Sequence, residues 1–116
     1  MHPWLALRFG TVVVGFVLSC CGGAGGPTGA LCDAQGQALT YANFGQDFMA
    51  NNCTTCHVTG ARPRLDSQAA VMANAHLIDS VAGAFGAVVN TYMPADRSLP
   101  VIERQKLAQW LACGAR

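Results

Sequence analysis

The pattern of apolar and polar positions predicts three main helices in this chain. In the first, over residues 41–51, Tyr41, Phe44 and Phe48 lie three and four positions apart, which places their rings on one helix face. Thr40 stands directly before this segment, where its hydroxyl can cap the helix N-terminus.

A second helix is expected to begin after Asp66 or Ser67, because either side chain can act as the N-cap. Gly83 and Gly86 are expected to end or loosen this helix near Phe85. Its apolar positions follow the helical spacing: Val71, Ala75, Ile78, Ala82 and Phe85.

The third helix is expected near residues 100–113. Pro100 suits its first turn, and Gly114 suits its C-terminal cap. No segment shows the sustained alternation that is typical of strands, so the pattern predicts an all-α fold with long irregular links. The apolar face of this third helix consists of Leu107, Trp110 and Leu111.

The first residues of the sequence predict a targeting segment. Ten uncharged residues, 9–18, follow Arg8 and precede Ser19, two cysteines and a glycine-rich run. A membrane-spanning helix needs about 20 apolar residues, and this run is half as long. The pattern is typical of a secretory signal peptide, with an uncleaved anchor or a buried helix as the alternative.

The end of this segment, Val17-Leu18-Ser19-Cys20, resembles the lipobox of bacterial lipoproteins. In that family a small residue precedes a Cys that is lipidated and becomes the new N-terminus, which implies lipidation of Cys20. Simple cleavage nearby is the alternative. We therefore expect residues 1–19 to be the signal peptide, 20–38 a tether with an N-terminal extension, and 39–116 the folded domain, held at the periplasmic face of a membrane.

Composition excludes two classes of protein. The chain has 116 residues, enough for one domain, and its apolar fraction of 52% excludes a disordered tail. Seven Lys and Arg stand against six Asp and Glu, and loss of residues 1–19 would remove Arg8 and leave six of each. Nucleic-acid binding needs a clustered basic surface, so no nucleic-acid partner is expected.

The chemical signal is the sequence Cys53-Thr54-Thr55-Cys56-His57, which is the C-x-x-C-H pattern of c-type haem attachment. Two thiols at this spacing can reach the two vinyl groups of one haem, and the adjacent imidazole can bind its iron. A redox dithiol would need a βαβ setting, and a zinc site would need four ligands with compatible directions. Export favours haem, because c-type haem is attached outside the cytoplasm.

Several segments together resemble a small monohaem cytochrome c of the class I type. The segment from Gly45 through Phe48 to the haem motif resembles that family's N-terminal helix, Met93-Pro94 resembles its methionine loop, and residues 103–111 resemble its C-terminal helix. The likeness covers about residues 39–114. It implies one covalent haem c per chain.

The resemblance implies a cytochrome c-like, all-α fold in which the first and last helices cross closely, with Gly45 permitting the approach to Trp110. If those helices cross, the chain ends lie near each other. A Cys32–Cys113 disulfide would then close a long loop and stabilise the domain by a few kcal/mol. Pairing of Cys21 with Cys32 is the alternative.

Four residues could be the second iron ligand beside His57. Met93 is the expected ligand, because it lies in a loop 36 residues after His57 and a proline stiffens the backbone beside it. Met49 precedes the motif on the same helix and cannot reach the far face of the haem. Met72 is expected in the core, and His76 is expected to be exposed or capping.

The loops around the motif contain further candidate residues. In the resembled family a proline carbonyl accepts the hydrogen bond of the proximal His Nδ1–H, and Pro63 is the matching position for His57. Arg62, Arg64 and Arg97 are nearby cations that could pair with haem propionates, with solvated surface as the alternative.

The resemblance implies an electron carrier whose iron keeps both axial ligands in both oxidation states. No coordination position is then open for a substrate, so no enzymatic activity is expected. The expected partners are redox proteins and, through the lipid, a membrane, with the chain as a monomer or as part of a larger complex. The alternatives are the haem subunit of a membrane oxidoreductase and a five-coordinate haem protein with peroxidase or gas-binding activity.

Overall fold

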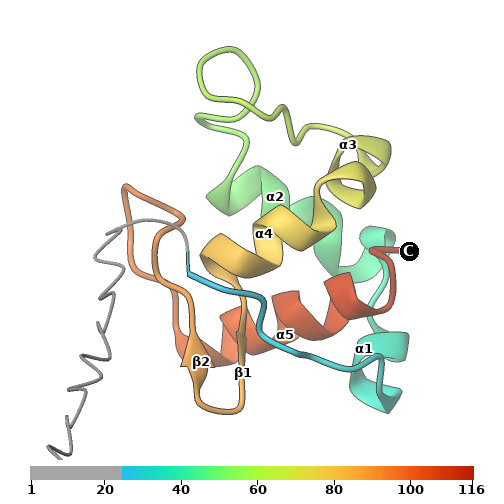
Figure 1. The fold of residues 1–116 in the computed structure, drawn as a ribbon. Coiled ribbons are helices and arrows are strands. Elements are labelled where there is room, and N and C mark those ends of the chain that lie inside the picture. The colour runs from blue at the N-terminus through green and yellow to red at the C-terminus, as the bar shows by residue number, and fades with distance from the viewer. Residues whose placement is uncertain (1–24) are drawn as a thin grey trace, which may run out of the picture.

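The structure, a computed structural model, describes residues 25–116 (Figure 1). The predicted signal peptide 1–19, the predicted lipidation site Cys20 and the unassigned Cys21 lie outside the described residues. The described part is mostly helical, in agreement with the all-α prediction. Its elements are α1 (Ala34–Ala38), the π-helix η1 (Tyr41–Gly45), α2 (Gln46–Asn52), α3 (Gln68–Ala73), α4 (Ala75–Ala82), β1 (Ala84–Phe85), β2 (Val88–Val89) and α5 (Val101–Ala112).

The first predicted helix is present as η1 followed directly by α2. Its N-terminus has a reciprocal capping box, because the Thr40 hydroxyl accepts from the Asn43 N–H at 3.0 Å and the Asn43 side chain accepts from the Thr40 N–H at 2.7 Å. The expected N-cap at Thr40 is therefore confirmed. The sequence pattern did not predict that the helix begins as the π-helix η1, whose turns are wider than those of an α-helix.

The second predicted helix is divided into two short ones. Ser67 caps α3 as expected, since its hydroxyl accepts from the Ala70 N–H at 3.1 Å. At Asn74 the backbone leaves the helical region, and its side-chain amide donates to the Ala70 carbonyl at 2.8 Å. This local hydrogen bond competes with the regular helical ladder and ends α3 before α4 begins.

Gly83 ends the second predicted helix, as expected, but the helix stops three residues before Phe85. Helix α4 ends at Ala82, and Gly83 is its extended C-cap residue. Residues Ala84–Phe85 instead pair antiparallel with Val88–Val89, and Gly86 has a φ of +57° in the turn between them. The β-branched valines favour extended backbone, and glycine favours the left-handed turn, so a small hairpin replaces the last helical turn.

Helix α5 crosses the first helical segment at close range. Gly45 lies against the Trp110 ring, where any Cβ would collide with the indole. Phe44 meets Trp110 edge to face at a centroid distance of 5.7 Å. Pro100 is the N-cap of α5, and Gly114 follows its end with a φ of +86°. Buried apolar residues around this crossing form the core: Phe48, Met49, Leu65, Val71, Ile78, Ala82, Leu107, Trp110, Leu111 and Ala115.

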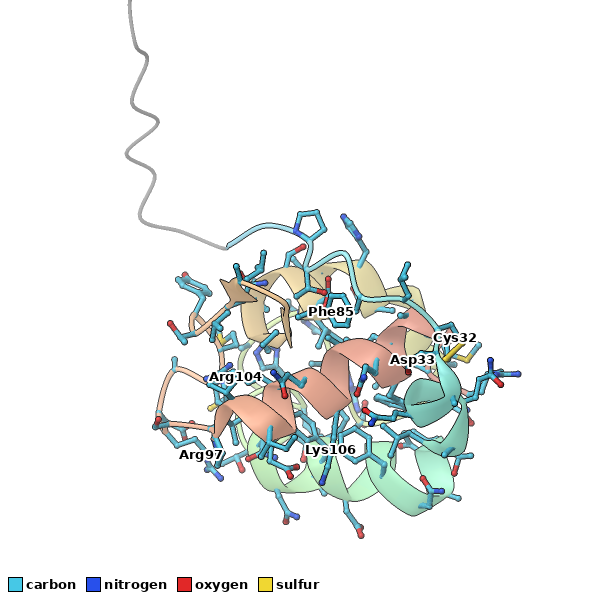
Figure 2. All side chains as sticks on the ribbon, turned by 90° about the horizontal axis from the view of Figure 1, so that it is seen from below. Cys32, Asp33, Phe85, Arg97, Arg104 and Lys106 are labelled. Atoms are coloured by element: carbon cyan, nitrogen blue, oxygen red, sulfur yellow. A yellow bond between two sulfur atoms is a disulfide. The ribbon has the colours of Figure 1, made fainter. Side chains whose placement is uncertain are left out.

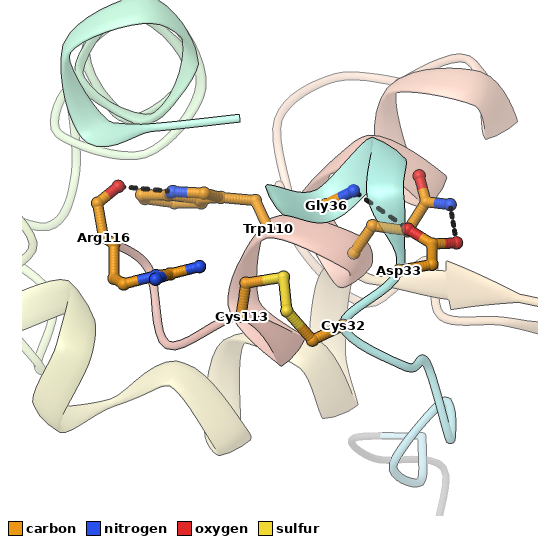
Figure 3. The surroundings of a disulfide bond; sticks show 7 residues. Cys32, Asp33, Gly36, Trp110, Cys113 and Arg116 are labelled. Atoms are coloured by element: carbon orange, nitrogen blue, oxygen red, sulfur yellow. Dashed lines mark hydrogen bonds between the residues drawn. A yellow bond between two sulfur atoms is a disulfide. The ribbon is translucent and has the colours of Figure 1, made fainter. Parts of the chain in front are cut away.

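The chain entering the domain is fixed to the end of α5 (Figure 3). Cys32 and Cys113 form the expected disulfide, with a Cα–Cα distance of 4.7 Å. The short helix α1, which was not predicted, follows directly and is capped by Asp33, whose carboxylate accepts from the Gly36 N–H at 2.9 Å. Gln109 of α5 donates to the same carboxylate at 3.1 Å. None of the helices formed by residues 25–116 is both long and apolar enough to cross a membrane.

Candidate functional site

A cavity of about 600 Å³ lies between α2, the loop that follows it, α4 and the loop before α5. All five residues predicted to hold the cofactor line this one cavity, although they are spread over 41 positions of the sequence: Cys53, Cys56, His57, Pro63 and Met93. Most of the remaining wall is apolar and is formed by Phe48, Ala61, Leu65, Leu77, Ile78, Val81, Ala82, Tyr92, Pro94 and Ala95. The cavity therefore combines a hydrophobic lining with a few grouped polar atoms, as ligand sites do.

The haem-type motif forms a hydrogen-bonded turn at the C-terminal end of α2. The Cys53 N–H donates to the Met49 carbonyl at 2.8 Å, which continues the helical pattern past Asn52. The Cys53 carbonyl then accepts from the His57 N–H at 2.9 Å. This turn directs both thiols and the imidazole to the same cavity, with Cys53 half-buried and Cys56 exposed.

The imidazole of His57 is held by the backbone of its own loop. Its Nδ1 lies 2.8 Å from the Pro63 carbonyl oxygen. A carbonyl can only accept, so Nδ1 carries the proton, and Nε2 is the nitrogen left to bind a metal. The Leu65 N–H also donates to the His57 carbonyl at 2.8 Å, which folds the loop back on itself. The position predicted for the histidine's hydrogen-bond partner is the one that the structure uses.

The thiol of Cys53 is neutral in this setting. Burial raises its pKa to about 11, and the nearby Arg97 guanidinium acts in the opposite direction with a smaller effect. A redox dithiol depends on a lowered thiol pKa, whereas this environment favours the protonated thiol.

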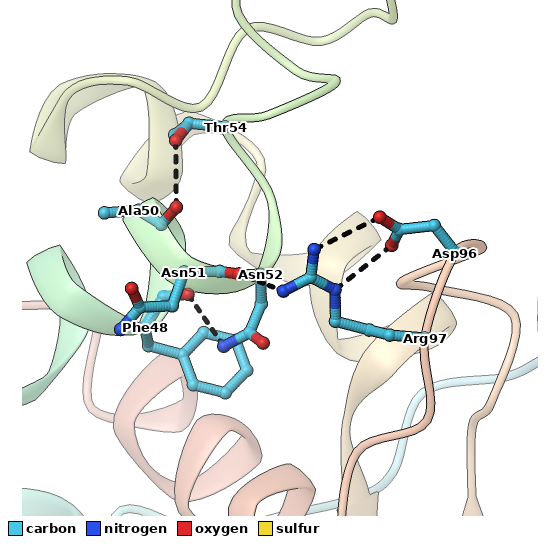
Figure 4. Close-up of polar contacts among 7 residues, drawn as sticks. All are labelled: Phe48, Ala50, Asn51, Asn52, Thr54, Asp96 and Arg97. Atoms are coloured by element: carbon cyan, nitrogen blue, oxygen red, sulfur yellow. Dashed lines mark hydrogen bonds and ion pairs between the residues drawn. The ribbon is translucent and has the colours of Figure 1, made fainter.

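Arg97 connects the loop before α5 to the end of α2 (Figure 4). Its guanidinium donates to the Asn51 carbonyl and pairs with Asp96 at 3.1 Å. Among the other expected cations, Arg62 lines the cavity and is exposed, while Arg64 pairs with Asp66 at 2.7 Å outside it. The structure therefore brings one of the three arginines into the cavity wall.

Met93 reaches the cavity from the loop before α5, and hydrogen bonds fix its backbone on both sides. Its N–H donates to the Val81 carbonyl at 2.8 Å, and its carbonyl accepts from Arg104 at 2.6 Å. The Arg104 residue is only 2% exposed. Its Nη1 also lies within hydrogen-bonding distance of the Ala82 and Asn90 carbonyls, at 3.0 and 2.8 Å.

Arg104 is a functional candidate that the sequence analysis missed. A signal was present, because Arg104 stands three and seven positions before Leu107 and Leu111 and therefore shares their buried helix face. A charged residue on the buried face of a helix indicates a buried polar partner. Here the partner is the Met93 carbonyl, in the loop between β2 and α5, which we call the methionine loop.

The other three residues weighed as iron ligands lie outside the cavity wall. Met49 is buried in the core and His76 is exposed. The expectation that Met72 lies in the core is wrong, because its side chain is 49% exposed. Adjacent side chains on an α-helix point about 100° apart, so Val71 is fully buried on α3 while the next residue, Met72, reaches the solvent.

Across residues 25–116, no three His, Cys, Asp or Glu side chains are grouped so that they could hold a metal ion. Comparisons of the chain with protein-family models, with curated proteins and with solved structures found no match.

Proposed function

We propose that this protein is a c-type cytochrome that carries electrons with one covalently attached haem. The observation that carries the proposal is the composition of one cavity. The C-x-x-C-H motif and Met93, which are far apart in sequence, line the same apolar space of about 600 Å³.

The residues fit a haem in their chemistry. Cys53 and Cys56 supply two thiols for thioether bonds, and His57 has Nε2 available because Pro63 holds Nδ1. Met93 would supply a soft, uncharged thioether as the second protein ligand to the iron, and a His/Met pair raises the potential relative to two histidines. A bound haem would supply an iron centre that accepts and releases one electron.

The protein's own part would be to bind the haem and to shield it from water. The apolar wall excludes water, and hydrogen bonds fix the backbone on either side of Met93. With His57 and Met93 both bound, no open coordination position is left for a substrate. We therefore propose an electron carrier and not an enzyme.

We further propose that the carrier is exported and anchored by lipid on Cys20, at the periplasmic face of a membrane, where redox proteins are its partners. Support comes from the lipobox-like sequence and from the Cys32–Cys113 disulfide, since disulfides form and persist in oxidising compartments.

The decisive experiment is expression of the full chain in a host with a cytochrome c maturation system. The purified protein should keep its haem on a denaturing gel and give cytochrome c absorption bands that sharpen on reduction. Cys53→Ser and Cys56→Ser should each weaken or abolish covalent haem. The matched double variant Cys32→Ser/Cys113→Ser should keep it. Exported, folded protein without haem would overturn the proposal, and a ferric spectrum without the long-wavelength methionine band would indicate the five-coordinate alternative.

A further inference from the structure

The segment 25–31, here called the N-terminal strap, lies across the outside of the domain and is attached at specific points. In Figure 1 it passes in front of α4 and α5 before it reaches α1. Thr28 is 6% exposed, and its N–H and hydroxyl donate to the two carboxylate oxygens of Asp79 on α4, both at 2.8 Å. The strap is therefore part of the folded domain.

The start of the strap is fixed beside the methionine loop. The Asn90 side-chain amide donates to the Gly26 carbonyl at 2.8 Å and to the Asp79 carbonyl at 2.9 Å, and Asn90 is 4% exposed. A Cβ on Gly25 would collide with the Asn90 amide, so the backbone approaches this side chain closely. Because Asn90 stands three residues before Met93, the strap starts next to the wall of the cavity.

The surface around this point carries no charge. Residues 25–31 and 80–95 contain no Asp, Glu, Lys, Arg or His. Val89 and Tyr92 are 43% and 53% exposed, so two large side chains without charge reach the solvent here. We call this the uncharged surface, and its exposed members include Gly25, Gly26, Pro27, Val89, Thr91 and Tyr92.

Charged groups border the uncharged surface without entering it. Asp79 has both carboxylate oxygens occupied by Thr28, and Arg104 is buried beneath. Asp96 and Arg97, which follow Met93 in the loop before α5, pair with each other, and the exposed His76 lines a hollow together with Pro27.

Chain length brings this surface close to the proposed lipid. Cys20 stands six residues before Gly26, and an extended chain spans at most about 3.5 Å per residue. A lipid on Cys20 would therefore lie within about 20 Å of the point where Asn90 fixes the strap.

We propose that the uncharged surface rests against the lipid bilayer in which the chain is anchored. Tyr92 suits the headgroup region, since tyrosine prefers the membrane–water interface, and Val89 can bury its side chain. The absence of charge in residues 25–31 and 80–95 means that no ion need be desolvated on contact. This inference rests on the proposed lipid anchor. It implies that the side of the domain that carries Met93 faces the membrane. Redox partner proteins would then approach along the plane of the membrane.

The experiment compares amide hydrogen exchange of the lipidated full chain in two forms. One form is anchored in vesicles of phosphatidylethanolamine and phosphatidylglycerol, and the other is released by proteolysis of the tether before Gly25. Mass spectrometry of the N-terminal peptide first establishes acylation. In the anchored form, peptides covering residues 86–92 should exchange about fivefold more slowly, while peptides from α2 should be unchanged.

Val89→Asp should remove most of this protection while leaving the haem spectrum unaltered. Met72→Asp is the matched control, because Met72 is similarly exposed, at 49%, but lies on α3. An acylated, anchored protein whose residues 86–92 exchange at the same rate in both forms would overturn the membrane-facing surface and leave the cytochrome proposal intact. A chain that is never acylated would overturn the anchor and this inference together, and loss of the haem spectrum alone would contradict only the cytochrome proposal.

Discussion

Arg104 of α5 donates a hydrogen bond to the carbonyl oxygen of Met93 at 2.6 Å from a position almost fully withdrawn from solvent. The same nitrogen reaches the carbonyls of Ala82, at the end of α4, and Asn90, just after β2. Desolvation lowers the guanidinium pKa, and these three carbonyls partly compensate for the lost water. One side chain thus connects the last helix to the loop that presents the proposed iron ligand. Figure 2 shows Arg104 on α5, between Arg97 and the Cys32 end of the helix.

Replacing Arg104 by Leu should loosen the methionine loop. Leu keeps much of the apolar volume but donates no hydrogen bonds, so the buried carbonyls lose their partner. The free energy of unfolding, measured by urea titration, should therefore fall by about 2–4 kcal/mol. The long-wavelength band of ferric methionine ligation should weaken, and loss of a buried positive charge should lower the potential. Arg64→Leu, at an exposed ion pair, is the control and should change none of these. Equal effects of the two substitutions would argue against this role.

Met93→Ala should open the proposed iron site. Loss of the soft thioether should lower the reduction potential and allow carbon monoxide to bind the reduced protein, which absorption spectra and redox titration will detect. Met72→Ala removes an exposed methionine outside the cavity and should leave both properties unchanged. If the Met93 variant kept its spectrum and potential, His76 or Met72 would have to be reconsidered as the ligand.

Removing the disulfide should destabilise the domain without releasing haem. The bridge spans 81 residues, and closing a loop of this size contributes about 4–5 kcal/mol through the unfolded state. Urea titration of Cys32→Ser/Cys113→Ser should show this loss, and mild reduction of the native protein should give the same value. Thioethers resist reducing agents, so a haem released by that treatment would show that Cys53 and Cys56 do not form them.

Gly45→Ala should disrupt the crossing of the first helical segment with α5. The added methyl group would overlap the Trp110 indole, and overpacking of this kind costs about 2–3 kcal/mol. Thermal unfolding is the direct measurement. Gly26→Ala is the matched control, because nothing lies within 4 Å of its added Cβ, and it should retain the stability of the original sequence.

Much of the fold could be predicted from short-range sequence patterns. The N-caps at Thr40 and Ser67 each bind a backbone N–H three residues further along the chain. In the C-terminal helix the three apolar residues expected to face the core are all buried: Leu107, Trp110 and Leu111. The break at Asn74 was missed because the apolar spacing continues through it. The helix α1 was missed because it has only five residues and depends on Asp33 and on packing against α5.

In the candidate site, too, the motif residues could be predicted from the sequence, whereas the partners of Arg104 could not. The association of His57 with Pro63 came from the resemblance to small cytochromes c, and the structure places the two within hydrogen-bonding distance, at 2.8 Å. Arg104 could not be assigned in this way, because its partners Ala82, Asn90 and Met93 become neighbours only when α5 packs against α4 and the hairpin. The helical spacing to Leu107 and Leu111 indicates that Arg104 lies on the buried face of α5, but it cannot identify the carbonyls that Arg104 binds, because they come from segments far away in the sequence.

The bond between Cys32 and Cys113 also turns the chain from residue 32 to residue 113 into a closed covalent ring. Most of the domain lies inside this ring, including the exposed loop after α2 that projects at the top of Figure 1. A protease that cuts this loop once opens the ring but releases no fragment, since both new ends stay joined through the disulfide. Clipped molecules would therefore migrate as one full-length species without reductant and as two pieces with it, and the protein would keep both halves of its cavity together after a single cut.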